Sequence, residues 1–211
     1  MAETSKMTHV ILASMIIAFS AAICTGQTAE DPPLSVQLEG LAPAPRLAYL
    51  RHLLTLGRED AEVMFQTAVA FHELGEADSA LHYYDMAIEL DPNDYKALVN
   101  KGVLLDEEGD YANAIRSFAE AATIKPDDVL ARSHLAFLLH QNGDHREAWL
   151  HLEAALEAGP GHAQPHFYLA IFFWDAKIYR EAIREWETVM ELEPNGFLAS
   201  RAQENIVMLQ K

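Results

Sequence analysis

The residues of this 211-residue chain that could do chemistry are mainly histidines and carboxylates, and ten His are present. His162 and His166 lie four residues apart, a spacing at which two imidazoles on one helix can share a metal ion. Pro165 lies between them where a helix is expected to begin, and no Cys or acidic residue completes a ligand set nearby. The sequence therefore predicts no metal site.

The other candidates for catalysis also have simpler explanations. Glu181 and Glu185 form a carboxylate pair of the kind used in general acid–base catalysis, but they lie on an amphipathic segment and are expected to be solvated. Three further histidines bracket a turn and the following helix, and they are not expected to share one face: His140, His145 and His151. No glycine-rich phosphate loop or metalloprotease motif is present. We expect no enzymatic activity and no cofactor.

A fixed period organises the elements that must position these side chains. Prolines recur every 34 residues, at Pro92, Pro126, Pro160 and Pro194. Twelve residues before each proline stands an alanine: Ala80, Ala114, Ala148 and Ala182. Eight residues before each proline stands a large hydrophobic residue: Tyr84, Phe118, Leu152 and Trp186. Such a period indicates repeated units, each of which buries its apolar face on its neighbours.

This pattern resembles the tetratricopeptide repeat. The resemblance implies an all-α, right-handed α-solenoid of four helix-turn-helix units within 61–194, at 61–94, 95–128, 129–162 and 163–196. Gly75, Gly109 and Gly143 fall between the two helices of a unit, where a left-handed residue ends a helix. Lys177 replaces this glycine in the fourth unit.

The flanks of the array are expected to cover its ends. Residues 46–60 are predicted to form a helix of a degenerate earlier unit, and residues 197–211 a capping helix. On the capping helix, the residues predicted to cover the last unit are Phe197, Ala202, Ile206 and Leu209. Residues 27–45 are proline-rich and predict a mostly extended tether with a short helix at 34–39.

The first 26 residues have the layout of a secretory signal, with Lys6 before an apolar run at 10–23 and small or polar residues after it. The alternative is an uncleaved anchor, although the run is short for a membrane helix. Cys24, the only cysteine, follows the run in a poor lipoprotein box, so lipidation there competes with ordinary cleavage after Gly26. We expect an exported protein, periplasmic or envelope-associated, with a possible membrane tether through its N-terminus.

The net charge of −17 restricts the partners. An acidic surface repels phosphate backbones and anionic lipid headgroups. We therefore expect no binding to nucleic acid.

The resemblance also implies a concave groove, lined by one face of the first helix of each unit. Its inner wall is predicted to be apolar and aromatic, with amide and imidazole groups beside it. We call these positions the groove residues: Phe65, Val69, Val99, Asn100, Val103, His134, Phe137, His140, Phe167, Tyr168, Ile171 and Trp174. Such a surface suits the docking of a mainly apolar peptide or helix segment of another protein.

One familiar use of such grooves is not expected. Domains of this family that clamp the C-terminal carboxylate of heat-shock chaperones need Lys, Asn, Lys and Arg at four groove positions. Here those positions hold Phe65, Val69, Leu130 and His134, and only Asn100 matches the clamp.

Two functions remain. The first is a non-catalytic scaffold, an envelope assembly adaptor that holds a client segment in the groove. The alternative is a structural or self-associating subunit of a stable complex. In either case the N-terminal tether or helix is a competing occupant of the groove.

Overall fold

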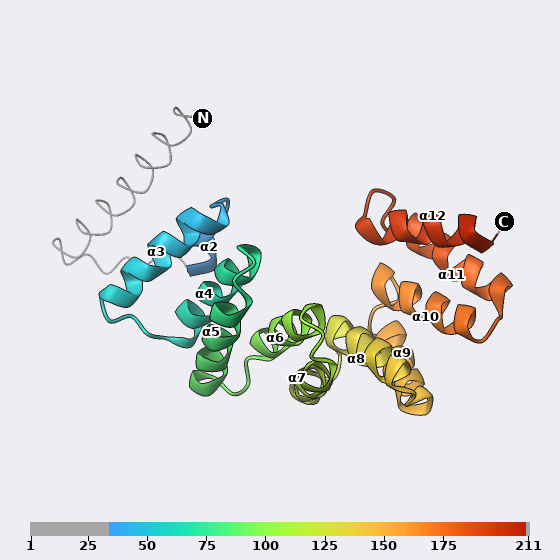
Figure 1. The fold of residues 1–211 in the computed structure, drawn as a ribbon, viewed down its shortest axis with the longest axis horizontal. Coiled ribbons are helices and arrows are strands. Elements are labelled where there is room, and N and C mark those ends of the chain that lie inside the picture. The colour runs from blue at the N-terminus through green and yellow to red at the C-terminus, as the bar shows by residue number, and fades with distance from the viewer. Residues whose placement is uncertain (1–33, 210–211) are drawn as a thin grey trace. The chain divides into compact units, whose positions relative to one another are not determined.

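The computed structural model describes residues 34–209, except for the side chain of Ser35. Within these residues every regular element is a helix, from α2 to α12 (Figure 1). The predicted leader and Cys24 lie outside the described residues. The chain divides into two compact units, Met1–Pro92 and Asn93–Lys211, and each is described by itself.

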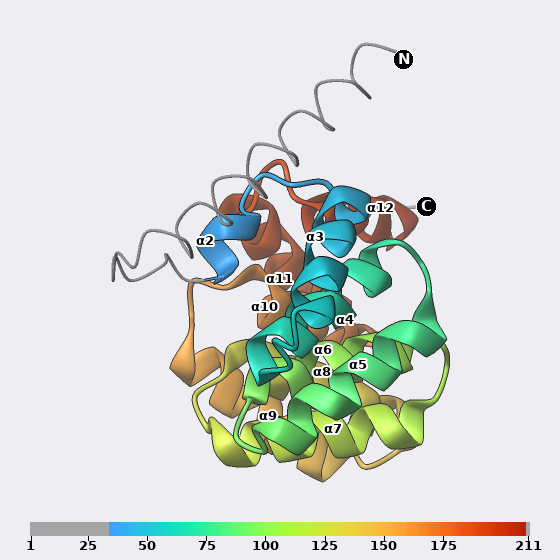
Figure 2. The ribbon, with the colours of Figure 1, turned by 90° about the vertical axis from the view of Figure 1, so that its left-hand side faces the viewer.

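The N-terminal unit is built on a helical hairpin. Its helices are α2 (Leu34–Leu38), α3 (Pro43–Thr55), α4 (Ala61–Glu73) and α5 (Ala77–Leu90). The hairpin consists of α4 and α5, which pack extensively along each other (Figure 2). Both α2 and α3 contact α4.

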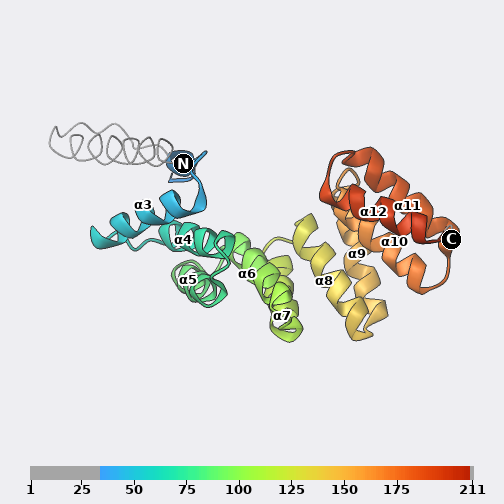
Figure 3. The same cartoon turned by 45° about the horizontal axis from the view of Figure 1, so that its top comes forward.

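The C-terminal unit contains three further hairpins and a final helix. Its helices are α6 (Tyr95–Glu107), α7 (Tyr111–Ile124), α8 (Val129–Asn142), α9 (His145–Ala158), α10 (Ala163–Asp175), α11 (Tyr179–Leu192) and α12 (Phe197–Leu209). The hairpins are α6–α7, α8–α9 and α10–α11, and α12 packs on α11 (Figure 3). Because α8 contacts both α6 and α10, the first helices of successive hairpins are neighbours. The prediction of four helix-turn-helix units is confirmed.

The repeated columns explain why the hairpins are tight. The four alanines that stand twelve residues before the prolines are completely buried. The large side chains four residues later are at most 1% exposed. Small residues let two helix backbones approach, and the large ones fill the remaining space. At Gly102 a Cβ atom would lie 2.9 Å from the ring of Phe118, so only a hydrogen fits there.

The turns inside the hairpins have the predicted geometry. Gly75, Gly109 and Gly143 have φ angles of 77°, 79° and 92°. Lys177 adopts the same left-handed conformation with φ 62°, and it is the one non-glycine residue of positive φ among residues 34–209. A side chain at such an angle is strained, so the fourth hairpin keeps its turn at some cost in stability.

Two predictions for the flanks differ from the structure. The helix expected to begin at Arg46 begins at Pro43, since proline is well suited to the first turn of a helix, and this shortens the predicted extended tether. Phe197, expected to cover the last unit, is 74% exposed. Ala199, Ala202 and Ile206 are the buried residues of α12, because they follow the helical spacing and Phe197 does not.

Candidate partner-binding surfaces

Two groove residues lie in the N-terminal unit, where α4 carries Phe65 and Val69. Both are half-buried. The ring of Phe65 lies 6.3 Å from that of Tyr84 on α5, so the hairpin itself supports it. In this unit each groove side chain is therefore partly exposed to solvent and partly packed on the hairpin.

The other ten groove residues lie on the neighbouring helices α6, α8 and α10 of the C-terminal unit. None of them is fully exposed. Val99, Phe167 and Tyr168 are buried, and the remaining seven are half-buried: Asn100, Val103, His134, Phe137, His140, Ile171 and Trp174. The packing of the hairpins therefore covers much of the predicted groove wall.

Ring stacking closes this face. The ring of His134 lies flat on Phe118 with centroids 5.0 Å apart, and its edge meets Tyr168 at 5.9 Å. The ring of Phe137 also stacks on Tyr168, with ring centroids 4.6 Å apart and an angle of 12° between the ring planes. Side chains of α7, α8 and α10 thus form one aromatic cluster, from which the half-buried Phe137 still offers surface.

The polar groups in this cluster are uncharged at neutral pH. Burial lowers the pKa of His134 to about 4 and raises the pKa of Tyr168 to about 12. The amide nitrogen of Gln164 donates to the Tyr168 hydroxyl at 3.1 Å and lies 2.8 Å from His134 Nε2. A neutral, internally bonded wall favours apolar partner groups over charged ones.

Two predicted groove residues are engaged elsewhere. Trp174 meets the buried ring of Trp186 edge-on at 5.2 Å, so it braces the α10–α11 hairpin. His140 stacks on Phe172 at 3.9 Å, and its Nε2 donates to Asp175 Oδ2 at 2.9 Å. These two side chains therefore belong to the hairpins as much as to the groove.

A second concavity, which we call the edge pocket, lies beside His140 and has a volume of about 600 Å³. Its apolar wall is formed by Trp149, Phe172, Phe173 and Ile178. His140, His145 and Asp175 provide polar groups. The Nδ1 atoms of the two histidines are 3.1 Å apart. Of the three histidines predicted not to share one face, His140 and His145 do meet, because the turn at Gly143 brings α9 back along α8, whereas His151 contacts Arg132.

The edge pocket was not predicted from the sequence, although one signal pointed to it. The residue that precedes the second helix of each hairpin is Glu76, Asp110 or Asp144 in the first three hairpins and Ile178 in the fourth. Among the three acidic residues only Asp110 caps its helix with its side chain. Ile178 is 46% exposed, and an exposed isoleucine that covers no core suggests a use outside folding.

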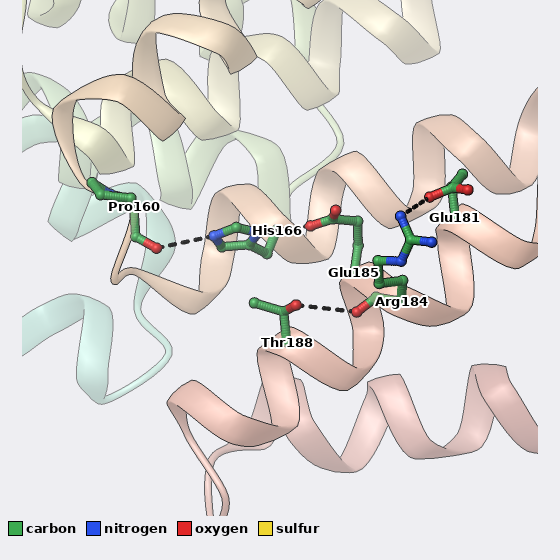
Figure 4. Close-up of polar contacts among 6 residues, drawn as sticks. All are labelled: Pro160, His166, Glu181, Arg184, Glu185 and Thr188. Atoms are coloured by element: carbon green, nitrogen blue, oxygen red, sulfur yellow. Dashed lines mark hydrogen bonds and ion pairs between the residues drawn. The ribbon is translucent and has the colours of Figure 1, made fainter.

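His166 on α10 and Arg132 on α8 occupy equivalent positions 34 residues apart, and both side chains bond within the protein. His166 Nδ1 lies 2.7 Å from Glu185 Oε2, and His166 Nε2 donates to the carbonyl of Pro160 at 3.0 Å (Figure 4). Arg132 makes the equivalent pair of contacts one repeat earlier, with His151 and the carbonyl of Pro126.

These contacts also account for the carboxylate pair. Glu185 is half-buried and bonded to His166, so the prediction that it is solvated was wrong. Glu181 accepts a hydrogen bond from Arg184 at 2.6 Å (Figure 4). Both carboxylates thus have structural partners.

The Glu185→Gln variant tests the His166 contact. The hydrogen bond to Glu185 raises the pKa of His166 above its usual value, against the opposing effect of burial. A raised pKa in the folded state means that the charged contact stabilises the protein fully below about pH 6.5 and less as the pH rises through the folded pKa. We expect the substitution to cost about 1 kcal/mol at acidic pH and less at pH 8, in urea unfolding. An equal loss at both pH values would contradict a charged contact.

In residues 34–209 no group of three or more His, Cys, Asp or Glu side chains is arranged to hold a metal ion. Nor does any helix of this region have the length and apolar character that spanning a membrane requires.

Stacked helical hairpins with a half-buried apolar face define the class of helical-repeat interaction proteins. The family model described as Tetratricopeptide repeat matches residues 47–95, 65–129 and 131–195, which together make up most of the chain. The chain belongs to the tetratricopeptide repeat family. Proteins of this family are in general non-catalytic scaffolds for protein–protein interaction.

Solved structures of the same fold agree with this assignment. TTC0263 of Thermus thermophilus is 18% identical with a TM-score of 0.66, over 82% of this chain and 96% of that one. MamA of Desulfovibrio magneticus RS-1, from residue 41 to its end, is 21% identical with a TM-score of 0.64, over 77% of this chain and 91% of that one. YrrB, described as having an unusual peptide-binding site, is 15% identical with a TM-score of 0.57, over 82% and 98%. A comparison with curated proteins gave no match.

Proposed function

We propose that this protein is an exported envelope adaptor that holds a mainly apolar segment of another protein against the groove residues. The observation that carries the proposal is the half-buried apolar row Val103, Phe137 and Ile171 on the adjacent helices α6, α8 and α10. Repeat packing supports these side chains without covering them completely. His134 and Tyr168 are themselves uncharged at neutral pH, and these neutral side chains favour an apolar guest.

The experiment begins with capture of the client from membranes, using the exported part as bait, and with a synthetic peptide of the captured segment. Phe137→Ser combined with Ile171→Ser should weaken binding of the peptide about thirtyfold, because losing aromatic and aliphatic anchors costs on the order of 2 kcal/mol. Trp174 is left intact in this variant, since it supports Trp186.

The matched control is Ile183→Ser, which removes a half-buried aliphatic side chain from α11, outside the groove residues. It should bind the peptide as the wild type does. Equal binding by the groove variant, with its helical circular dichroism preserved, would rule out this face as the site. Gain of affinity on removal of the N-terminal tether would show that the tether competes for the groove.

Export is tested separately. The layout of residues 1–26 supports it, and intact mass of the mature protein distinguishes its forms. A chain beginning at Gln27 indicates ordinary cleavage, and a chain beginning at a diacylated Cys24 indicates a lipoprotein. A cytosolic product that begins at Met1 or Ala2 would refute the export part of the proposal.

One observation favours the alternative of a self-associating subunit. On α12, Phe197, Val207 and Met208 are 74%, 40% and 56% exposed. Exposed apolar groups on a terminal helix are suited to contact with a second copy. Light scattering over a concentration series decides between the two: a mass that rises with concentration, and falls in Phe197→Ser, supports self-association.

A further inference from the structure

We propose that the edge pocket, which shares only His140 with the groove residues, is a second binding site that receives an arginine side chain of a partner protein. The pocket combines aromatic walls with a carboxylate at its rim, and it lies wholly within the C-terminal unit. The inference does not rest on the proposed function of the groove, and the two can fail independently.

The hydrogen bonds in the pocket determine the polarity of its free groups. A carboxylate only accepts, so His140 Nε2 must carry the hydrogen in its 2.9 Å bond to Asp175 Oδ2. In the neutral imidazole His140 Nδ1 is then an acceptor, and His145 Nδ1 must be the donor across the 3.1 Å contact. His145 Nε2 is therefore left as an acceptor.

The hydrogen-bonded series His145, His140 and Asp175 therefore leaves hydrogen-bond acceptors free in the pocket and no free donor. Within the part of the chain that the structure describes, no group pairs with His145 Nε2 or with Asp175 Oδ1. The Asp175 side chain is 56% exposed, so an incoming group can reach it. A ligand that carries several donors and a positive charge satisfies both atoms.

The walls select the shape of that ligand. Trp149 on α9 is 45% exposed, and Phe173 on α10 lines the same pocket. A guanidinium is planar, stacks flat on aromatic faces and donates in a fixed fork, whereas an ammonium is a compact point charge without that plane or fork. The exposed Ile178 can cover the aliphatic stem of the same side chain.

The charge of the protein agrees with a basic partner. The net charge of −17 attracts cationic segments over a distance, and the edge pocket provides a specific site at which such a segment can bind. Lys177 lies two residues after Asp175 in the sequence, and its positive charge repels an incoming cation. Replacing it with Gln is expected to strengthen the binding of a cation.

The test is a titration with arginine capped at both ends, followed by the indole N–H signal of Trp149 in nuclear magnetic resonance. The equivalent capped citrulline has nearly the same shape and no charge. We expect the arginine compound to shift the Trp149 signal and to bind at least about fivefold more tightly than the citrulline compound. Trp149→Phe assigns the signal among the three tryptophans of the chain.

Asp175→Asn removes the charge at the rim and is expected to weaken binding of the arginine compound about fivefold, with no preference left over citrulline. Glu157→Gln removes an exposed carboxylate from α9 outside the pocket, and it should leave binding unchanged. Circular dichroism checks that all variants remain folded.

Four results would overturn the proposal. Equal affinity for the two capped compounds would mean that the pocket is apolar and does not recognise charge. Much tighter binding of free arginine would indicate a site for the amino acid and not for a protein. An unshifted Trp149 signal would show that no ligand enters the pocket. A wild-type dimer that dissociates in the Trp149→Ala variant would show that a second copy of the chain covers the pocket.

Discussion

Replacing Ala114 with Trp should lower the free energy of unfolding of the C-terminal unit by more than about 3 kcal/mol. Ala114 lies on α7 with no exposed surface, in the column where the two helices of a hairpin approach each other. Overpacking of a close contact costs about 1–3 kcal/mol for ordinary enlargements, and an indole is an extreme one. Urea unfolding followed by circular dichroism measures the loss.

Ala112→Trp is the matched control, since Ala112 lies two residues earlier on the same helix and is exposed. The same indole there should change the stability by less than about 0.5 kcal/mol. If both variants lost the same stability, the alanine column would not mark the close helix contact.

Replacing Trp186 with Ala should cost about 3–5 kcal/mol, because it leaves a large cavity beneath Trp174. Trp186 has no exposed surface. Its indole nitrogen is buried and has no hydrogen-bond partner among the described residues. Trp186→Phe therefore removes an unsatisfied polar group together with part of the ring, and it should cost only about 1 kcal/mol.

Chemical denaturation of the two variants gives the comparison. If phenylalanine were as damaging as alanine, the indole N–H would have a partner in solution, such as a buried water, and the core would depend on it. If alanine cost less than about 1 kcal/mol, the large column would not fill the hairpin core.

The architecture could be predicted because its determinants are periodic. Ala148, Leu152 and Pro160 mark a hairpin by their types and spacing alone, and their equivalents recur in the other units. Even the irregular Lys177 turn followed from its column, and the structure gives it the left-handed angle of the glycines. Phe197 was misplaced because the array ends there, and no following repeat fixes which face is covered.

The candidate sites were less predictable, because they depend on which neighbours each side chain meets. The repeat pattern assigned Phe137 and Tyr168 to the groove, but it could not show that their rings stack on each other. His140 and His145 meet only because the turn at Gly143 folds one helix onto the next. Spacing on a single helix carries no information about such contacts between elements.

The paired contacts of Arg132 and His166 have a consequence for cooperativity. Each side chain joins the loop that leaves one repeat to the two helices of the next, through the carbonyl of Pro126 or Pro160. In a linear array the stability is a sum of terms within repeats and terms between nearest neighbours. These bonds add to the second kind of term, so we expect the backbone amides of α8 to α11 to exchange through shared rather than separate openings.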